Sequence, residues 1–427
     1  MTEGSGRKRR RAIVAAAIGN LLEWYDFAVY GFMATVLAGR FFPAENDAVS
    51  LLATFAAFGV GFAARPLGAI LIGRLADRRG RKTALMVTIS LMAIGTVAIG
   101  LAPDYRTIGV WAPALIVFAR LIQGFSAGGE WGSSTAFMVE WADQGRRGLV
   151  GSFQQVSVAG GLLMGSGCAA LVGTILTDDA VAEWGWRIPF LLGGAIGLVA
   201  LYMRRHVDET PAYRRVVAGD RVMAADRVAA VGGHPLKAAA RAFGFTIHWT
   251  VSYYIFLAYM PTFAERHLGL DRTVALWSNS LGLLVLVLTV PLAGLLSDRI
   301  GRKPLLLASC IGFAVLAYPL FDHMLGGTSI GAIMAAQVLF GLLIALYSGP
   351  GPAAIAEMFA TLGRATWMSV GYSLAVAIFG GFAPFVSTWL IAATGSALAP
   401  VFYVLAAAAV TALVILTMPE TARRRLD

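Results

Sequence analysis

The residues best able to do chemistry in this sequence are ionisable side chains that interrupt long apolar stretches. A charge at the depth of a lipid bilayer is costly unless it is paired or hydrated, so such a residue marks a functional site by default. Carboxylates at these positions could bind and release protons, and guanidinium groups could hold an anion. The residues are Glu23, Asp26, Arg65, Arg120, Glu130, Glu140, His248 and Glu357.

Asp26 and Glu23 form the first candidate group, for proton binding. They lie three residues apart, so a helix places both on one face. Neighbouring buried carboxylates bind protons more tightly than isolated ones in water, which suits proton exchange near neutral pH. We expect Asp26 and Glu23 to carry protons, with Glu130 as a further carrier or a buried hydrogen-bonding residue. The alternative for Asp26 is a structural ion pair with Arg120.

Arg120 and Arg65 form the second candidate group, for binding an anionic substrate. A guanidinium group holds a carboxylate through two parallel hydrogen bonds. The alternatives are a permanent ion pair for Arg120 and packing beside Pro66 for Arg65. Snorkelling of a long side chain to the headgroups, or hydrogen bonds between helices, would equally explain four further candidates for substrate contact. These are Arg187, Gln154, Gln155 and His248.

The elements that hold these residues follow from the composition. Hydrophobic residues make up 58% of the 427 residues and charged residues only 14%, with mean hydropathy +0.72. A soluble domain is roughly 45–50% apolar and about 25% charged, so the sequence predicts an integral membrane protein. We expect an all-α fold of twelve transmembrane helices in two six-helix bundles, because twelve apolar segments can each cross a bilayer. Segments 1 to 12 are residues 12–38, 49–75, 83–101, 110–140, 148–176, 186–203, 238–263, 273–296, 304–321, 329–357, 365–393 and 398–418.

The longest polar stretch divides the twelve segments into two groups of six. We therefore expect an N-terminal bundle at 1–203, a cytoplasmic linker at 204–237 and a C-terminal bundle at 238–427. Most of the 34 Lys and Arg residues lie at the two ends and in alternate loops. Because positively charged loops stay in the cytoplasm, both termini are predicted to be cytoplasmic. The net charge of +10 is explained by this orientation, and not by nucleic-acid binding.

A ten-residue pattern occurs twice, each time between the second and third segments of a half. The first copy, Gly73–Lys82, contains Gly73, Asp77, Arg78, Gly80 and Arg81. The second, Gly294–Lys303, contains Gly294, Asp298, Arg299, Gly301 and Arg302. The pattern resembles the signature loop of the major facilitator superfamily, whose members consist of two parallel six-helix repeats.

This resemblance implies a transporter that works by alternating access, with the two signature loops as a switch. By family resemblance, Asp77 and Asp298 make charge contacts with neighbouring helix ends while the cytoplasmic side is closed. Glu140 and Glu357 lie near the cytoplasmic ends of segments 4 and 10, at equivalent places in the two halves. We expect them to pair with signature-loop arginines as gate residues.

Further motifs resemble the metabolite:H⁺ symporter family within this superfamily. The resemblance implies import of a small organic acid or zwitterion together with protons. The motifs are Gly19–Phe27, Arg65–Gly68, Arg120–Glu130, Glu183–Phe190 and Asp208–Pro211. Residues 41–45 and 377–384 are most similar to citrate and tricarballylate symporters. The expected function is therefore proton-coupled import of citrate or a related tricarboxylate.

Several alternatives to this function stay open. Other members of the family import proline or betaine, 2-oxoglutarate or shikimate, although the few residues after Met418 count against osmosensing. A receptor or a membrane enzyme would need a signalling domain or a nucleophile–base pair, and neither is recognisable. Cys168 and Cys310 lie in apolar segments and predict neither a disulfide nor a metal site. We expect no enzyme activity, no cofactor and no nucleic-acid partner, and a monomer in the inner membrane that contacts only the organic acid, protons and lipid.

Overall fold

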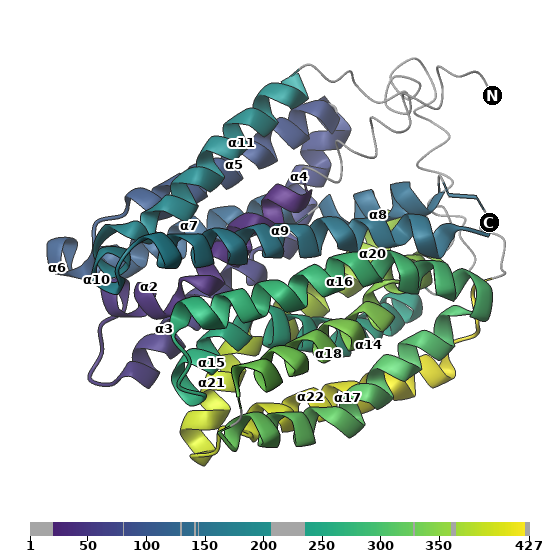
Figure 1. Ribbon diagram of the computed structural model, residues 1–427. Helices are drawn as coiled ribbons and strands as arrows, with labels where there is room; N and C mark the ends of the chain where they lie inside the picture. The colour runs from purple at the N-terminus through teal and green to yellow at the C-terminus, as the bar shows by residue number, and fades with distance from the viewer. Residues whose placement is uncertain are drawn as a thin grey trace.

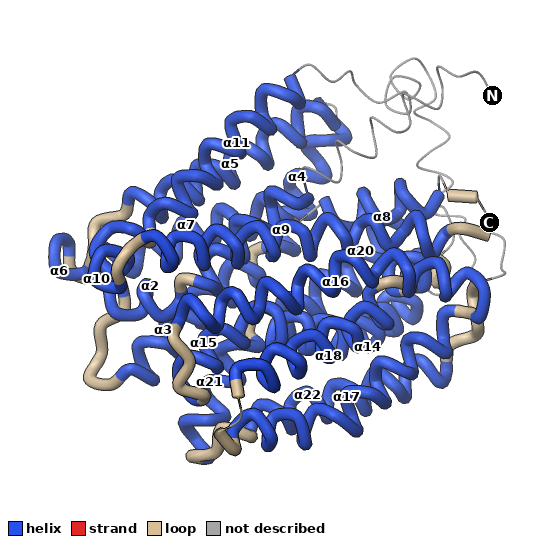
Figure 2. Tube along the Cα trace, in the orientation of Figure 1, coloured by secondary structure: helices blue, strands red, loops and turns tan. Residues whose placement is uncertain are grey.

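The computed structural model describes residues 20–79, 81–128, 130–140, 142–143, 145–205, 235–327, 329–359 and 364–422. Within these ranges all regular secondary structure is helical (Figure 2). Each of the twelve predicted apolar segments contains a helix. The predicted all-α fold is therefore confirmed.

The N-terminal half is built from segments 1 to 6. Segment 1 comprises residues 20–32 and α2 (Ala34–Phe41). Segments 2 to 6 are, in order, α3 (Asp47–Ala63) with α4 (Arg65–Arg79), α5 (Arg81–Leu101), α7 (Trp111–Ala127) with α8 (Glu130–Glu140), α9 (Arg147–Ile175) and α11 (Arg187–Arg205). Three short helices connect them, namely α6 (Tyr105–Ile108), α10 (Asp178–Ala180) and the π-helix η1 (Val181–Gly185).

The C-terminal half is built from segments 7 to 12. Segments 7 and 11 each contain a π-helical turn, a feature that often marks functional sites. In order, the helices are α14 (Pro235–Tyr254), η2 (Ile255–Tyr259) and α15 (Met260–His267) in segment 7, α16 (Arg272–Ile300), α17 (Arg302–Leu325), α18 (Ile330–Ser348) with α19 (Gly351–Ala356), α20 (Arg364–Ala375) with η3 (Val376–Gly380) and α21 (Ala383–Thr394), and α22 (Ala399–Thr417).

Length and hydropathy identify these helices as membrane-spanning. Among the described residues, seven helical stretches of 19 to 29 residues are apolar enough to cross a bilayer, and three shorter apolar helices accompany them. Polar N-caps begin helices at or beside the breaks between the predicted segments: Asn46 begins α3, Asp104 begins the short helix α6, and Ser329 begins α18. Each cap satisfies a backbone N–H group that the first helical turn leaves without a partner.

The helices form two bundles that meet along a long interface. Helices α3 to α11 pack together in the first bundle, and α14 to α22 pack together in the second. Figure 1 shows α9 and α16 side by side along the contact between the bundles. The charged groups of segments 1, 2 and 4 are buried, and Phe62, which lies over Arg65, contacts Tyr254 of the second bundle.

Glycines bring segments 2 and 4 into backbone contact. A Cβ atom at Gly124 would overlap the carbonyl oxygen of Gly61, and one at Gly128 would overlap that of Arg65. Small residues allow this close approach between membrane helices. The crossing places Arg120 beside Gly61 and Arg65 beside Gly128, and the two side chains converge from these positions on Phe27.

Candidate functional site

Two buried arginines lie among aromatic rings at the centre of the molecule. The guanidinium carbon of Arg65 is 5.0 Å from the ring centre of Phe27 and 4.8 Å from that of Phe62. That of Arg120 is 4.7 Å from Phe27 and 4.6 Å from Tyr30. Aromatic faces attract cations at these distances. We call this group, with Trp24 and Tyr254, the aromatic centre.

Glu23 and Arg65 form a buried ion pair at the edge of the aromatic centre. Nη2 of Arg65 is 3.1 Å from Oε1 of Glu23, and both side chains are at least nine-tenths buried. The structure thus joins a residue predicted to carry protons to one predicted to bind substrate. A buried ion pair that loses one partner leaves a charge without compensation.

Asp26 and Arg120 are linked through two neutral side chains. Nη1 of Arg120 donates to Oε1 of Gln123 at 2.9 Å, and Nε2 of Gln123 donates to Oγ1 of Thr96 at 2.8 Å. Thr96 lies beside the carboxylate of Asp26, opposite Gly193 of α11. Oδ1 of Asp26, like Nε and Nη2 of Arg120, is buried without a hydrogen-bond partner. This conformation therefore leaves hydrogen-bonding capacity on both charged groups.

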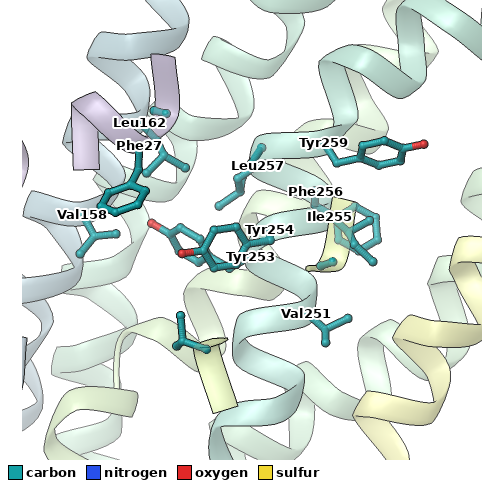
Figure 3. Packing of buried hydrophobic residues seen from close by; sticks show 14 of the residues in the cluster. Phe27, Val158, Leu162, Val251, Tyr253, Tyr254, Ile255, Phe256, Leu257 and Tyr259 are labelled. Carbon is teal, nitrogen blue, oxygen red and sulfur yellow. The ribbon is translucent and has the colours of Figure 1, made fainter. Parts of the chain in front are cut away.

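Segment 7 contributes two further unsatisfied donors from the opposite bundle. The hydroxyl groups of Tyr253 and Tyr254 are buried and have no partner. Figure 3 shows both rings projecting from segment 7 toward Phe27. The rings of Trp24 and Tyr254 are 6.1 Å apart, so the aromatic centre spans both bundles. Buried donors without partners call for an explanation, and a ligand with an oxygen anion would supply one.

The other predicted substrate contacts lie outside the aromatic centre. The ring of His248 packs on Phe313 and Tyr347, and its Nε2 is 3.5 Å from Oγ of Ser309. Arg187 donates to the carbonyl oxygen of Ala102 and lies over Trp186. In α9, Gln155 donates to Oε1 of Gln154, whose own Nε2 has no partner. Glu130 begins α8, and its side chain is outside the described part of the structure.

A charged network joins the bundles at the face that carries the second signature loop, which we call the signature-loop face. The carboxylate of Asp298 accepts hydrogen bonds from the backbone N–H groups of Gly148 and Leu149, at 2.8 and 2.9 Å. These groups begin α9, where a helix attracts negative charge. Nη1 of Arg302 is 2.8 Å from Oδ1 of Asp298, and Nη2 of Arg302 is 3.2 Å from Oε1 of Glu357.

Among the described residues, Glu140 pairs with Arg364. Nη1 of Arg364, which begins α20, is 2.7 Å from Oε1 of Glu140. The expected pairing with a signature-loop arginine stays a prediction, because the side chains of Arg78 and Arg81 lie outside the described residues. The fold brings the end of segment 4 to the start of segment 11, and this proximity is not visible in either segment alone. In the first signature loop, Gly80 and the side chains of Asp77, Arg78 and Arg81 lie outside the described residues, while Gly73 is part of α4.

Contacts also join the bundles at the opposite face. Arg266 and Asp47 form an ion pair at 2.6 Å. Nε1 of Trp277 donates to Oγ1 of Thr174 at 3.1 Å. The aromatic centre is therefore enclosed from both faces in this conformation.

Sequence reasoning missed Gln123, Thr96 and Arg364. Gln123 follows Arg120 by three residues, so a search for polar residues on the helical face of Arg120 would have found it. Thr96 and Arg364 carry no comparable signal, because only the packing of segments 3 and 11 gives them their partners.

Two helical bundles that enclose buried charged and aromatic groups, and that contact each other at both faces, are the arrangement of a multi-pass membrane transporter. A family model described as "Sugar (and other) transporter" matches residues 12–243, and one described as "Major Facilitator Superfamily" matches residues 241–426. The chain belongs to the major facilitator superfamily. It is a transporter and not an enzyme.

Similar proteins with assigned names are also transporters. The chain is 34% identical to the proline/betaine transporter of Escherichia coli (strain K12), over 98% of this chain and 85% of the relative. It is 37% identical to the alpha-ketoglutarate permease of the same strain, over 91% of this chain and 88% of the relative. The xylose transporter XylE from E. coli, in a partially occluded inward-open conformation, matches with a TM-score of 0.77 at 18% identity, over 97% of this chain and 98% of the other. At this identity, the likeness to XylE shows the fold alone.

These relatives do not support the expected citrate specificity. Their names point to the alternatives, proline or betaine and 2-oxoglutarate. The expectation relied on residues 41–45 and 377–384, which are almost entirely apolar apart from Glu45. Residues 43–45 are exposed in the connection between α2 and α3, and residues 377–384 lie in segment 11 and carry no charge, so neither stretch distinguishes substrates of different charge.

Proposed function

We propose that this chain is a proton-coupled symporter that imports a small zwitterion of the proline or betaine kind. The observation that carries the proposal is the charge balance of the aromatic centre. Glu23 already pairs with Arg65, whereas two guanidinium nitrogens of Arg120 have no partner. One substrate carboxylate would satisfy Arg120 through two hydrogen bonds. The rings of Trp24 and Tyr254 would attract the cationic nitrogen of the substrate.

A dicarboxylate such as 2-oxoglutarate fits this charge balance less well. Its second carboxylate would need Arg65, which is held by Glu23 at 3.1 Å. Binding would then have to break a buried ion pair, which costs about 3–5 kcal/mol when a partner is lost. The 37% identical alpha-ketoglutarate permease makes 2-oxoglutarate the substrate to compare.

Asp26 is the proposed proton carrier. Its carboxylate lies close enough to Arg120 to attract it, and one of its oxygens is free to take a proton. When Asp26 is protonated, its negative charge no longer repels the substrate carboxylate or attracts Arg120 away from it. Proton and substrate binding would thereby favour each other. Glu23 is less suited to this role, because Arg65 holds its charged form.

Alternating access would proceed by rocking of the two bundles about the aromatic centre. We place the bundles at residues 1–203 and 238–427, the linker at 204–237, and both termini in the cytoplasm of a bacterial inner membrane. The basic residues of the linker and the alternate loops support this orientation. The signature-loop face would then be the cytoplasmic one.

Uptake by the purified protein in liposomes tests the proposed function. Labelled proline, betaine and 2-oxoglutarate are supplied with an inward proton gradient, with citrate as a competitor. We expect betaine or proline to accumulate, and accumulation to collapse with a protonophore. Accumulation of 2-oxoglutarate alone would overturn the zwitterion assignment. Uptake that does not depend on the proton gradient would overturn proton coupling.

The Asp26→Asn variant tests proton coupling separately from substrate binding. This variant should still exchange labelled for unlabelled substrate across the membrane, because the neutral amide imitates the protonated carboxyl group. It should no longer accumulate substrate against a gradient. Asp322→Asn, at the far end of α17, is the matched control and should behave like the wild type.

A further inference from the structure

A small cavity lies inside the N-terminal bundle, away from the other bundle. It lies among segments 1, 3, 4 and 6, and its polar lining consists of Glu23, Asp26, Thr88 and Ser126. Ala93 of α5 is part of its apolar lining. The cavity volume is about 30 Å³. Because a water molecule needs roughly 10–15 Å³ of such space, the cavity has room for about two.

The groups around this cavity favour water over an empty void. Apolar cavities stay dry, whereas cavities with several polar partners hold water. The Oδ1 atom of Asp26 is buried at the cavity without any protein partner. Oγ of Ser126, another lining atom, is a hydroxyl that can accept a hydrogen bond in addition to the one it donates to Thr88.

Segment 1 lies between the cavity and the rings of the aromatic centre, and Glu23 is a lining residue that also reaches Arg65. Trp24 and Phe27 of that segment face Arg65 and the rings of segments 2 and 7. Asp26 faces the other way, toward Gly193 of α11. Helices α5 and α11 pack on their own bundle, and Figure 1 shows them on the side away from α14 to α22.

We infer that Asp26 exchanges its proton with water in this cavity, by a route that does not pass through the substrate site. This inference rests on the proposed function, in which Asp26 carries the proton. A hydronium ion delivered through the cavity gives its proton to the carboxylate, leaving a neutral carboxylic acid and a water molecule. Release is the reverse step. Protonation can therefore occur while the aromatic centre is enclosed from both faces.

The charged groups around Asp26 are consistent with such a route. Glu23 comes from its own helix, Arg120 from segment 4, and Arg65 from segment 2 through its pair with Glu23. Segments 3 and 6 face it with Thr96 and Gly193. Among these contacts, the side of Asp26 that faces segments 3 and 6 has no cation that would repel an approaching proton.

Filling the cavity tests the inference. Ala93→Leu places extra methyl groups in the cavity, and Val87→Leu adds one at an exposed position of the same helix as a control. The internal pH of liposomes is followed with a dye while substrate is added outside. We expect proton entry with substrate to slow about tenfold in Ala93→Leu, while substrate exchange at equal pH stays within about twofold of the wild type. Val87→Leu should change neither.

The outcomes distinguish this inference from the proposed function. Absence of substrate-driven proton entry in the wild type would overturn the proposed function. Normal entry in the wild type and in a folded Ala93→Leu variant would overturn the cavity route alone. A second measurement needs no variant: a map of the wild-type protein in lipid nanodiscs, at a resolution that shows water, should contain water beside Oδ1 of Asp26. A dry cavity there would also overturn the route.

Discussion

Arg120 reaches Asp26 only through neutral side chains, and Gln123 is the first of them. Gln123 accepts from Arg120 and donates to Thr96, so it holds the guanidinium group in place without neutralising it. Its neutrality is what leaves Arg120 available to a substrate carboxylate. A neutral residue is easily passed over in a sequence, because the search for function begins with charges.

Replacing Gln123 by glutamate should therefore inhibit substrate binding. The new carboxylate would occupy Arg120 and compete with the substrate, and we expect KM to rise about tenfold or more, the equivalent of about 1.4 kcal/mol. The defect should persist between pH 5 and 8, because the adjacent guanidinium group favours the charged form of the new carboxyl group. Initial rates of betaine or proline uptake across this range measure the change in KM. Gln337→Glu, in α18, is the control, and an unchanged KM in Gln123→Glu would contradict the proposed role of Arg120.

The Glu23–Arg65 pair makes a second prediction at this scale, about selectivity. Glu23→Gln releases Arg65, so a second carboxylate gains a partner in the aromatic centre. Uptake of 2-oxoglutarate should rise relative to betaine, and the protein should lose about 3–5 kcal/mol of stability without ligand. Thermal unfolding and competition between the two labelled substrates measure these effects. Glu23→Asp keeps the charge and should keep the selectivity, whereas unchanged selectivity in a folded Glu23→Gln variant would refute the charge-balance argument.

The elements themselves were largely predictable, because membrane helices follow from local hydropathy. Neighbouring residues in the sequence are enough to recognise the twelve segments, the polar residues Asn46 and Ser329 at helix starts, and the glycines of segment 4. Pairings between elements were not predictable in the same way. The partner of Glu140 is Arg364, more than two hundred residues away, and no periodicity relates them. The sequence identifies the candidate charged residues because they interrupt apolar segments. Their partners depend on how the segments cross in three dimensions, which the sequence of one segment does not show.

The short segment that follows α22 contacts the start of α17 through Glu420, and this contact should depend on pH. Burial acts to raise the pKa of Glu420, but hydrogen bonds from the backbone N–H groups of Arg302, Ala422, Lys303 and Thr421 outweigh it and lower that pKa below its ordinary 4.5. A lowered pKa in the folded state stabilises the fold at neutral pH. This contribution is lost as the pH falls through 4.5 toward the lowered value.

Glu420→Gln should therefore lower Tm at pH 7 and have a smaller effect as the pH falls below about 4.5. The amide cannot accept from as many N–H groups with the strength of a carboxylate. Thermal unfolding of both proteins in detergent across this range tests the prediction. A Tm difference that stays constant from pH 7 down to the acid range would show that the charge of Glu420 does not hold this segment.

At the scale of the whole molecule, the two faces of the interface are closed by contacts of unequal strength. The ion pair between Arg266 and Asp47 is solvent-accessible, since the Asp47 side chain is 80% exposed. Exposed pairs contribute about 0–1 kcal/mol. On the signature-loop face, Glu357 and Arg302 are each only 1% exposed, and Asp298 caps α9 across the interface. Opening the signature-loop face therefore costs more, and we expect the empty transporter to open at the opposite face first.

Spin labels across each face test this asymmetry. Labels at Arg146 and Arg299 report the signature-loop face, and labels at Asp179 and His267 report the opposite face; all four positions are exposed. Without substrate, the second pair should show the broader distance distribution. Glu357→Gln should lengthen the first distance, because breaking a buried pair costs about 3–5 kcal/mol, whereas Asp47→Asn should change neither pair by much. If Asp47→Asn shifted the equilibrium as strongly as Glu357→Gln, burial would not be what sets the resting conformation, and the superfamily loop would serve orientation in the membrane more than gating.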